Sequence, residues 1–370
     1  MENNAPKIEW QYISVEQLRN GDFTLGDDKY GLAAYVLSPA RVAAVLNCPF
    51  HTSEQNTALI FCNVDGVVAS RDELFGTRLK LGEDIVPCMS GTALETHENY
   101  RHLALAAEIM MFGHRNDEYE CTLSAGISSM AKPLHKKLKY AYFETPILLV
   151  YKDSRAKFSE RGLKGPALWL ASKLYNLSLL GDMLKQRNAA KSIHKKFKVQ
   201  RENIVPEWVD DIVLNDGHKY MEVHDQKWLQ WNLDYNFSDN QRNSQAFYCI
   251  YEKGGKPVGF FMIKERCDKK KDGCIQGVTG SLVEWGSNDL SLLSEEDINV
   301  LALESYKSDV NIAITTTDIP ATQQSLAKYG LKHKGSITNI SCRANRKKYP
   351  DIYDIKNWRI RLGYADTIFY

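Results

Sequence analysis

The sequence predicts an α/β (α+β) protein whose two halves each form a mixed, mainly antiparallel sheet flanked by helices. Two observations predict this fold. Strand-like runs rich in β-branched and aromatic residues alternate with helical patterns along the chain. A hairpin with turn residues at its tip also occurs once in each half, at Asp65-Gly66 and at Gly254-Gly255, and a similar order of elements follows each hairpin.

Length and composition are those of a globular protein with two domains. The 370 residues exceed one typical domain, and 44% are hydrophobic and 25% charged. We expect a first domain at 1–155, a helical connector at 156–200 and a second domain at 201–370. The formal net charge of +1 provides no overall field that would attract nucleic acid, so no nucleic-acid partner is expected.

The chain shows no signal peptide, no membrane span and no metal-ligand spacing among its eight scattered cysteines. Cysteines inside apolar strand-like runs are typical of reduced, buried thiols. A cytoplasmic location is therefore expected. Two basic runs, 264–272 and 343–350, fall beside predicted turns, and we interpret them as solvated loop charge.

In the first half, helical patterns come before the strands. The second of them, 38–47, has Ser38 as cap and Pro39 at its first position. The elements that follow, in order, are strands at 57–64, 66–81 and 84–96, a helix at 97–112, a strand at 118–126, a short helix at 129–137 and a strand at 140–151. Gly91 inside the third strand suggests a bulge or a close backbone approach.

The segment 165–184 is strongly apolar and helical, and Lys173 and Asp182 interrupt it. We predict a helix packed between the two domains. The alternative is a helix that lies in a membrane interface.

The second half repeats the order of the first. Its expected strands are 245–252, 256–266, 281–285, 310–317 and 337–345, with helices at 293–308 and 319–331. Thr96 follows Gly66 by 30 residues, and Trp285 follows Gly255 by the same 30. Internal duplication explains this match.

Residues 95–112 lead from the end of a strand into a helix. One helix face is apolar and carries Leu103, Ala107, Met110 and Met111. The free N–H groups and the dipole at a helix start favour an anion such as phosphate, and small residues let it approach. Arg101 could add charge, and Ala104 and Ala106 leave the backbone accessible. The alternative is an ordinary amphipathic helix with an exposed arginine.

This stretch resembles the coenzyme-A-binding motif of the GNAT superfamily of acyl-CoA N-acyltransferases, Val-x-Pro-x-Tyr-Arg-x-x-Gly-x-Gly/Ala. Tyr100 and Arg101 match the motif, Ala106 is allowed, and Ala104 replaces the first glycine. Thr96 and Glu98 stand at the Val and Pro places. The sequences LHKKLKY and LAKYGLK resemble two versions of a second family motif, so the resemblance covers both halves and implies a tandem pair of GNAT-like domains.

The resemblance implies acetyl-CoA as co-substrate in the first half and no metal. The coenzyme-binding residues that it implies are Leu94, Thr96, Arg101, His102, Leu103, Ala104, Leu105 and Ala106. In the second half, Glu295, Glu296 and Asp297 crowd the helix start where pyrophosphate would lie, so this half is expected to be a degenerate copy.

The resemblance also implies catalytic groups for the attack of an amine on the thioester. Glu95 or Glu98 would act as base, and a backbone N–H near Leu94 would bind the thioester oxygen. The proton donor would be His135, which stands where the family has a tyrosine, or Tyr140. Each carboxylate could instead be merely solvated, and His135 could be a surface residue among lysines.

The function predicted is acetyl-CoA-dependent N-acetylation of a primary amine on a small molecule, such as an amino sugar. Two alternatives stay open. One is a Fem-like transferase that uses aminoacyl-tRNA, and the other is a non-catalytic acyl-CoA-binding or scaffold protein. A homodimer is compatible with the sequence.

Overall fold

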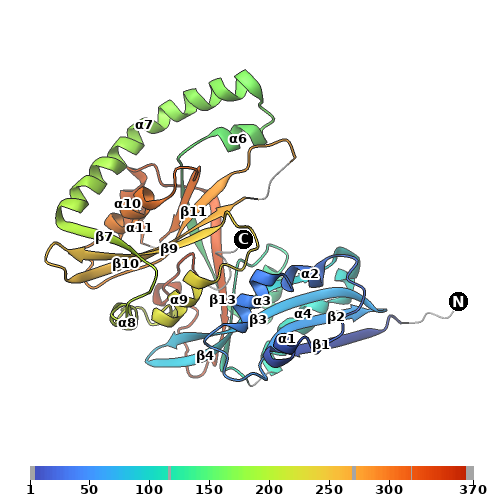
Figure 1. Ribbon diagram of the computed structural model, residues 1–370. Coiled ribbons are helices and arrows are strands. Elements are labelled where there is room, and N and C mark those ends of the chain that lie inside the picture. The colour runs from blue at the N-terminus through green and yellow to red at the C-terminus, as the bar shows by residue number, and fades with distance from the viewer. Residues whose placement is uncertain (1–4, 116–117, 269–271, 318, 364–370) are drawn as a thin grey trace.

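The computed structural model describes residues 5–115, 118–268, 272–317 and 319–363. Within these ranges thirteen strands form one continuous mixed sheet flanked by helices (Figure 1). Most neighbouring strands are antiparallel, which confirms the predicted fold class. The order across the sheet is β1-β2-β3-β4-β5-β13-β6-β12-β11-β10-β9-β7, and β8 pairs with β3 outside this path.

The first half contributes six strands, and β2 begins and ends at the predicted residues. The strands are β1 (Ile8–Ser14), β2 (Thr57–Val64), β3 (Val67–Leu81), β4 (Asp84–Thr96), β5 (Cys121–Ala125) and β6 (Ala141–Tyr151). The helices are α1 (Val15–Asn20), α2 (Leu32–Val36), α3 (Pro39–Leu46), the 3₁₀ helix η1 (Glu98–Leu103), α4 (Leu105–Arg115) and α5 (Lys132–Lys137). The helix expected at 97–112 is thus η1 followed by α4.

The remaining elements repeat the hairpin, strand–helix and strand–helix order. The strands are β7 (Phe197–Glu202), β8 (Tyr220–Glu222), β9 (Ser244–Glu252), β10 (Pro257–Cys267), β11 (Val278–Ser287), β12 (Ile312–Thr316) and β13 (Lys332–Arg343). The helices are α6 (Arg155–Glu160), α7 (Gly165–Lys196), α8 (Val209–Leu214), α9 (Gln226–Asp234), α10 (Glu295–Ser305), α11 (Pro320–Ala327) and the 3₁₀ helix η2 (Ile355–Asn357). Within the basic run 264–272, Lys269 to Lys271 lie outside the described residues.

The halves exchange their last strands. β13, from the end of the chain, inserts between β5 and β6 of the first half, where Ile340 pairs with Ala125 and with Phe143. β6 in turn lies between β13 and β12, where Leu149 pairs with Ile314. Neither half therefore has a complete sheet of its own.

The two halves also share a hydrophobic core. On β2 and β10, alternate residues enter different clusters because successive strand residues point to opposite faces. Phe61 and Phe260 belong to a cluster with residues of α1, α2, α3, α8 and α9, whereas Ile60 and Phe261 face α4 and α10 respectively. One face of the sheet is thus covered by helices from both halves.

Helix α7 lies along the outer side of the second half (Figure 1). Three of its four buried residues, Gln186, Ala190 and Ile193, are in its C-terminal part, which packs on α10. We expected this segment to pack between the two halves, but it packs on α10 of the second half. The domain boundaries at 155 and 200 stay a prediction. Across the described part of the chain, no helix is long and apolar enough to cross a membrane.

Candidate active site

Strands β4 and β5 separate part-way along their length. They pair in parallel from Cys88–Cys121 to Gly91–Ser124, and β4 then continues to Thr96 without a partner on β5. The separation opens a cavity of about 670 Å³ that reaches α4 and α5. Gly91, which we expected to mark an irregularity, is the last β4 residue paired with β5.

A β-bulge lies in β4 directly beyond this point. Arg71 pairs with Glu95 and Glu73 pairs with Thr92, so Asp72 alone faces the two residues Ala93 and Leu94. Ala93 has a φ of 59°, in the left-handed region that non-glycine residues rarely adopt. A bulge leaves backbone groups outside the ladder, and this bulge borders the cavity.

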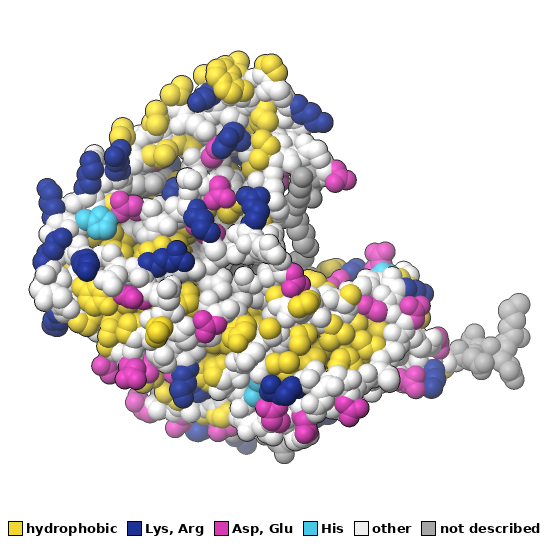
Figure 2. Space-filling view, viewed as in Figure 1, with side chains coloured by type: hydrophobic (Ala, Val, Ile, Leu, Met, Phe, Trp, Pro, Cys, Tyr) yellow, Lys and Arg dark blue, Asp and Glu magenta, His cyan; other side chains and the backbone are white. Residues whose placement is uncertain are grey.

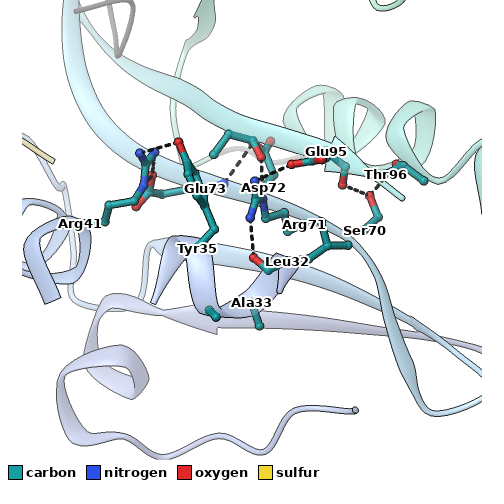
Figure 3. A network of polar contacts seen from close by, with 12 residues as sticks. Leu32, Ala33, Tyr35, Arg41, Ser70, Arg71, Asp72, Glu73, Glu95 and Thr96 are labelled. Carbon is teal, nitrogen blue, oxygen red and sulfur yellow. Dashed lines mark hydrogen bonds and ion pairs between the residues drawn. The ribbon is translucent and has the colours of Figure 1, made fainter. Parts of the chain in front are cut away.

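The guanidinium of Arg71 holds the bulge in place (Figure 3). Its Nε donates to the Ala93 carbonyl at 3.2 Å, its Nη1 to the Leu32 carbonyl at 2.6 Å, and its Nη2 to Glu95 Oε2 at 2.6 Å. It also lies over the Tyr35 ring, 4.1 Å from the centroid. The guanidinium thus ties the irregular part of β4 to helix α2.

Four consecutive polar residues of β3 are buried beside the bulge: Ser70, Arg71, Asp72 and Glu73. Glu73 forms a buried ion pair with Arg41, whose Nε donates at 2.9 Å (Figure 3). Asp72 accepts a hydrogen bond from the Glu73 N–H at 3.0 Å and lines the cavity. The sequence interpretation missed Asp72 and Arg71. The signal was present, because a run of four polar residues inside a strand is unusual unless they serve a buried site.

The cavity wall is largely apolar. Its large apolar side chains include Leu74, Met89, Ile109, Met110, Phe112, Met130 and Leu134. Its polar groups come from the β3–β4 bulge on one side and from His135 and Tyr140 on the other. An apolar chamber with a few converging polar groups is the usual form of a small-molecule site.

His135 is buried rather than exposed among its neighbouring lysines. Its Nδ1 lies 2.7 Å from the Ser341 hydroxyl of β13, and its ring meets Tyr140 edge-on at 5.1 Å. Burial lowers the pKa of His135 to about 4, so the imidazole is neutral at pH 7. Burial also raises the pKa of Tyr140, so its phenol stays protonated.

The structure brings together some of the predicted site residues and not others. Leu94, Glu95, Thr96, Arg101, Ala106, His135 and Tyr140 line the cavity. Glu98, His102, Leu103, Ala104 and Leu105 do not line it. Glu98 and His102 are exposed on η1, whereas Leu103 and Leu105 pack on a cluster around Cys62 and Ala69. Ala104 ends η1 with a φ of 55°, which is a glycine conformation.

Neither a comparison with protein-family models nor one with curated proteins finds a match. Solved structures do resemble this chain. Saccharomyces cerevisiae N-myristoyltransferase with bound myristoyl-CoA matches with a TM-score of 0.55 and 12% identity over 93% of this chain and 86% of that chain. A GCN5-related N-acetyltransferase from Anabaena variabilis matches with a TM-score of 0.51 and 11% identity, over 92% and 74% of the two chains. A probable N-acyltransferase from Enterococcus faecalis matches with a TM-score of 0.51 and 11% identity, over 94% and 74%.

The chain has a GNAT-like fold. In this fold the cavity between β4 and β5 belongs to the first half, as the position of the motif led us to expect.

A second cavity of about 650 Å³ adjoins the first and shares Gly126 and Ile127 with it. The exchanged strands β6 and β13 form much of its wall, and Arg266 of β10 and Ser281 of β11 reach it from the second half. Lys132 pairs with Glu144 at this wall. Both halves of the GNAT-like fold therefore build this cavity.

The corresponding helix start in the second half, that of α10, is acidic. Ser294 and Asp297 form a capping box at the start of α10, and the buried Glu295 accepts a hydrogen bond from Thr317 at 3.1 Å. These carboxylates occupy the helix start that an anion would need.

The strand β11 has a bulge at Val283, but the neighbouring carboxylate is fixed. Glu284 binds Arg359 at 2.9 Å and also contacts His224, and all three side chains are buried. Burial alone would raise the pKa of Glu284, but Arg359 and His224, together with Arg361, lower it to about 2. The carboxylate is therefore committed to a structural network.

Proposed function

We propose that this protein is an acyl-CoA-dependent N-acyltransferase that transfers an acyl group to a primary amine on a small molecule. The observation that carries the proposal is the cavity between β4 and β5, with a bulge at one side and the start of α4 at the other. The fold shared with N-acyltransferases supports it.

In this proposal, the coenzyme lies between the separated strands, and its pyrophosphate faces the first turn of α4. Arg101 and the small Ala106 line this end of the cavity. Arg101 supplies positive charge, and Ala106 leaves the helix N–H groups within reach of a phosphate. Thr96, whose hydroxyl lies 2.7 Å from that of Ser70, fixes the end of β4.

The reaction is a direct displacement. The amine nitrogen attacks the thioester carbonyl carbon, the C–S bond breaks, and the amide and the coenzyme thiolate form. The Leu94 N–H, at the bulge, donates to the oxyanion, and a carboxylate takes the amine proton through water. Asp72 is our candidate for this base, because it is buried and lines the cavity opposite the bulge residues Ala93 and Leu94, whereas the Glu95 side chain is 52% exposed.

The proton for the leaving thiolate comes from Tyr140. We considered His135 for this role, but at a pKa of about 4 its protonated form is scarce at neutral pH. The Tyr140 phenol remains protonated and lines the cavity. His135 then acts as a positioning residue against the Tyr140 ring.

The donor expected from the motif is acetyl-CoA. The apolar wall around Ile109, Phe112 and Leu134 favours a second candidate, an acyl-CoA with a longer chain, because an acetyl group would leave this wall unfilled. The amine enters through the adjoining second cavity, where Arg266 and the Lys132–Glu144 pair offer polar contacts.

Calorimetric titration with acetyl-, octanoyl- and myristoyl-CoA tests the donor site. The wild type and Ala106→Asp are compared with Ala167→Asp, which places the same charge in the first turn of α7, away from the cavity. We expect binding to the wild type and to Ala167→Asp, and a loss of at least about 100-fold in Ala106→Asp, because the new charge faces pyrophosphate. No binding of any acyl-CoA to the wild type would refute the proposal and favour the aminoacyl-tRNA alternative.

Turnover is tested by measuring the release of free thiol with a panel of primary amines. Tyr140→Phe should lower kcat about 100-fold with little change in the KM for acyl-CoA, the usual scale for a lost general acid. Tight acyl-CoA binding without turnover of any amine would identify the scaffold alternative instead.

A further inference from the structure

The N-terminal part of helix α7 exposes a row of large apolar side chains. They are Trp169, Leu170, Leu174, Leu177, Leu180, Met183 and Leu184, each 40–63% exposed. Figure 2 shows this row along the upper edge of the molecule. Apolar patches of this kind on a soluble protein usually mark a surface that binds something.

The row points away from the protein. At 100° per residue, the buried residues Ser172, Gln186, Ala190 and Ile193 lie on one side of the helix and the centre of the apolar row on the other. The packing that holds α7 on α10 therefore leaves the row open to its surroundings.

The same helix is strongly basic. From Lys164 to Lys196 it carries Lys164, Lys173, Lys185, Arg187, Lys191, Lys195 and Lys196, with Asp182 as the one acidic residue. Arg187, Lys191 and Lys195 are exposed and continue the outward face beyond Leu184. The outward face is thus apolar in its first half and basic in its second.

We propose that α7 binds the surface of an anionic membrane. Leucine and tryptophan side chains would enter the boundary between headgroups and acyl chains, and the lysines and Arg187 would meet anionic headgroups. The helix would lie on the membrane, since it is not apolar enough to cross one. This inference does not depend on the proposed enzymatic activity.

A second copy of the chain fits the same face less well. A parallel pair of α7 helices would bring the basic ends together, and an antiparallel pair would place each basic end on the other's leucines. Both arrangements are unfavourable, because the first brings like charges together and the second buries charge against apolar surface.

Vesicle flotation tests the proposal with the full chain. We expect the wild type to float with phosphatidylcholine vesicles that contain phosphatidylglycerol, and to float less as salt is added. Leu174→Glu with Leu177→Glu should lower the affinity at least about tenfold, because it places two charges at the apolar boundary. Lys191→Glu with Lys195→Glu should lower it about tenfold or more on anionic vesicles.

Leu290→Glu with Leu292→Glu is the matched control, since both leucines are exposed outside α7. This control should float as the wild type does, and thermal unfolding shows whether each variant is folded. The proposal would be overturned if the wild type does not float with anionic vesicles. It would also be overturned if the folded Leu174→Glu/Leu177→Glu variant floats as the wild type does. A wild-type dimer that becomes a monomer in that variant, seen by light scattering, would assign the face to a second copy.

Discussion

Ala104 shows how one residue can preserve the conformation of a motif without its glycine. It ends η1 with a φ of 55°, and its N–H donates to the Arg101 carbonyl at 3.2 Å. The left-handed region costs an L-residue roughly 1–2 kcal/mol of conformational free energy, whereas glycine adopts it without this cost. The exposed methyl group of Ala104 does not line the cavity, so the substitution leaves the approach to α4 open.

Ala104→Gly should therefore stabilise the fold by up to about 1 kcal/mol, after allowing for the greater freedom of glycine in the unfolded chain. Ala106→Gly, inside α4, should destabilise it by about 1 kcal/mol. Urea unfolding of both variants measures the difference. A loss of stability in Ala104→Gly as large as that in Ala106→Gly would contradict the left-handed conformation.

Burial of His135 should make stability depend on pH. Its pKa falls from 6.5 in the unfolded chain to about 4 in the folded one, so between these values the unfolded chain binds the proton more readily. Stability should fall by up to roughly 3 kcal/mol as the pH drops from 6.5 to 4, and this contribution should level off below 4.

Urea unfolding at several pH values measures this effect. His135→Gln should remove the rise in the free energy of unfolding between pH 4 and 6.5 that His135 causes. His333→Gln, at an exposed position, should keep this rise. An unchanged slope in His135→Gln would show that other groups cause the pH dependence.

At the scale of elements, local patterns predicted most of the fold. The apolar run and the Asp65-Gly66 turn that follows it located β2 at 57–64, and a helical pattern located α10 within 293–308, because these signals act over a few residues. β1, β7 and β8 were missed. β1 leads directly into α1 and β7 directly follows α7, so both were interpreted as parts of helical segments, and β8 has only three residues. Gly91 indicated an irregularity in β4, but the position of the bulge at Ala93–Leu94 was not predictable, because it depends on how β3 and β4 pair.

The starts of α4 and α10 should differ in their affinity for anions. The start of α4 borders the cavity, whereas Glu295, Glu296 and Asp297 occupy the first turn of α10. Calorimetry should give one acyl-CoA per chain, and Glu296→Gln should leave that stoichiometry unchanged. Two equivalent sites per chain would contradict the assignment of the second half as a degenerate copy.

At the scale of the whole molecule, the exchange of β6 and β13 was beyond sequence analysis. Each strand has the pattern of a closing strand in its own half, and only the assembled sheet decides which neighbours it takes. The segment around the motif placed Leu94, Glu95, Thr96, Arg101 and Ala106 at the cavity, but it gave no sign of Arg71 and Asp72, which come from the neighbouring strand. The contact between His135 and Ser341 was not, because the two residues are far apart along the chain.

The exchange predicts that neither half folds alone. A fragment of residues 1–200 lacks β13 and exposes its part of the shared core, so it should show no cooperative thermal unfolding. Co-expression with residues 201–370 should yield a complex that unfolds in one transition, as the full chain should. Differential scanning calorimetry of the fragments and the complex checks this, and a cooperative transition in the isolated 1–200 fragment would contradict it.

Because β13 lies near the end of the chain, its partner strands β5 and β6 are synthesised well before it. Ala125 leaves the ribosome long before its partner Ile340, and at about 5–20 residues per second the delay is roughly 10–40 s. During this interval the edges of β5 and β6 are unpaired, and exposed strand edges favour aggregation. A chaperone that shields these edges should raise the yield of this protein, and a premature stop before β13 should leave a product without a finished cavity.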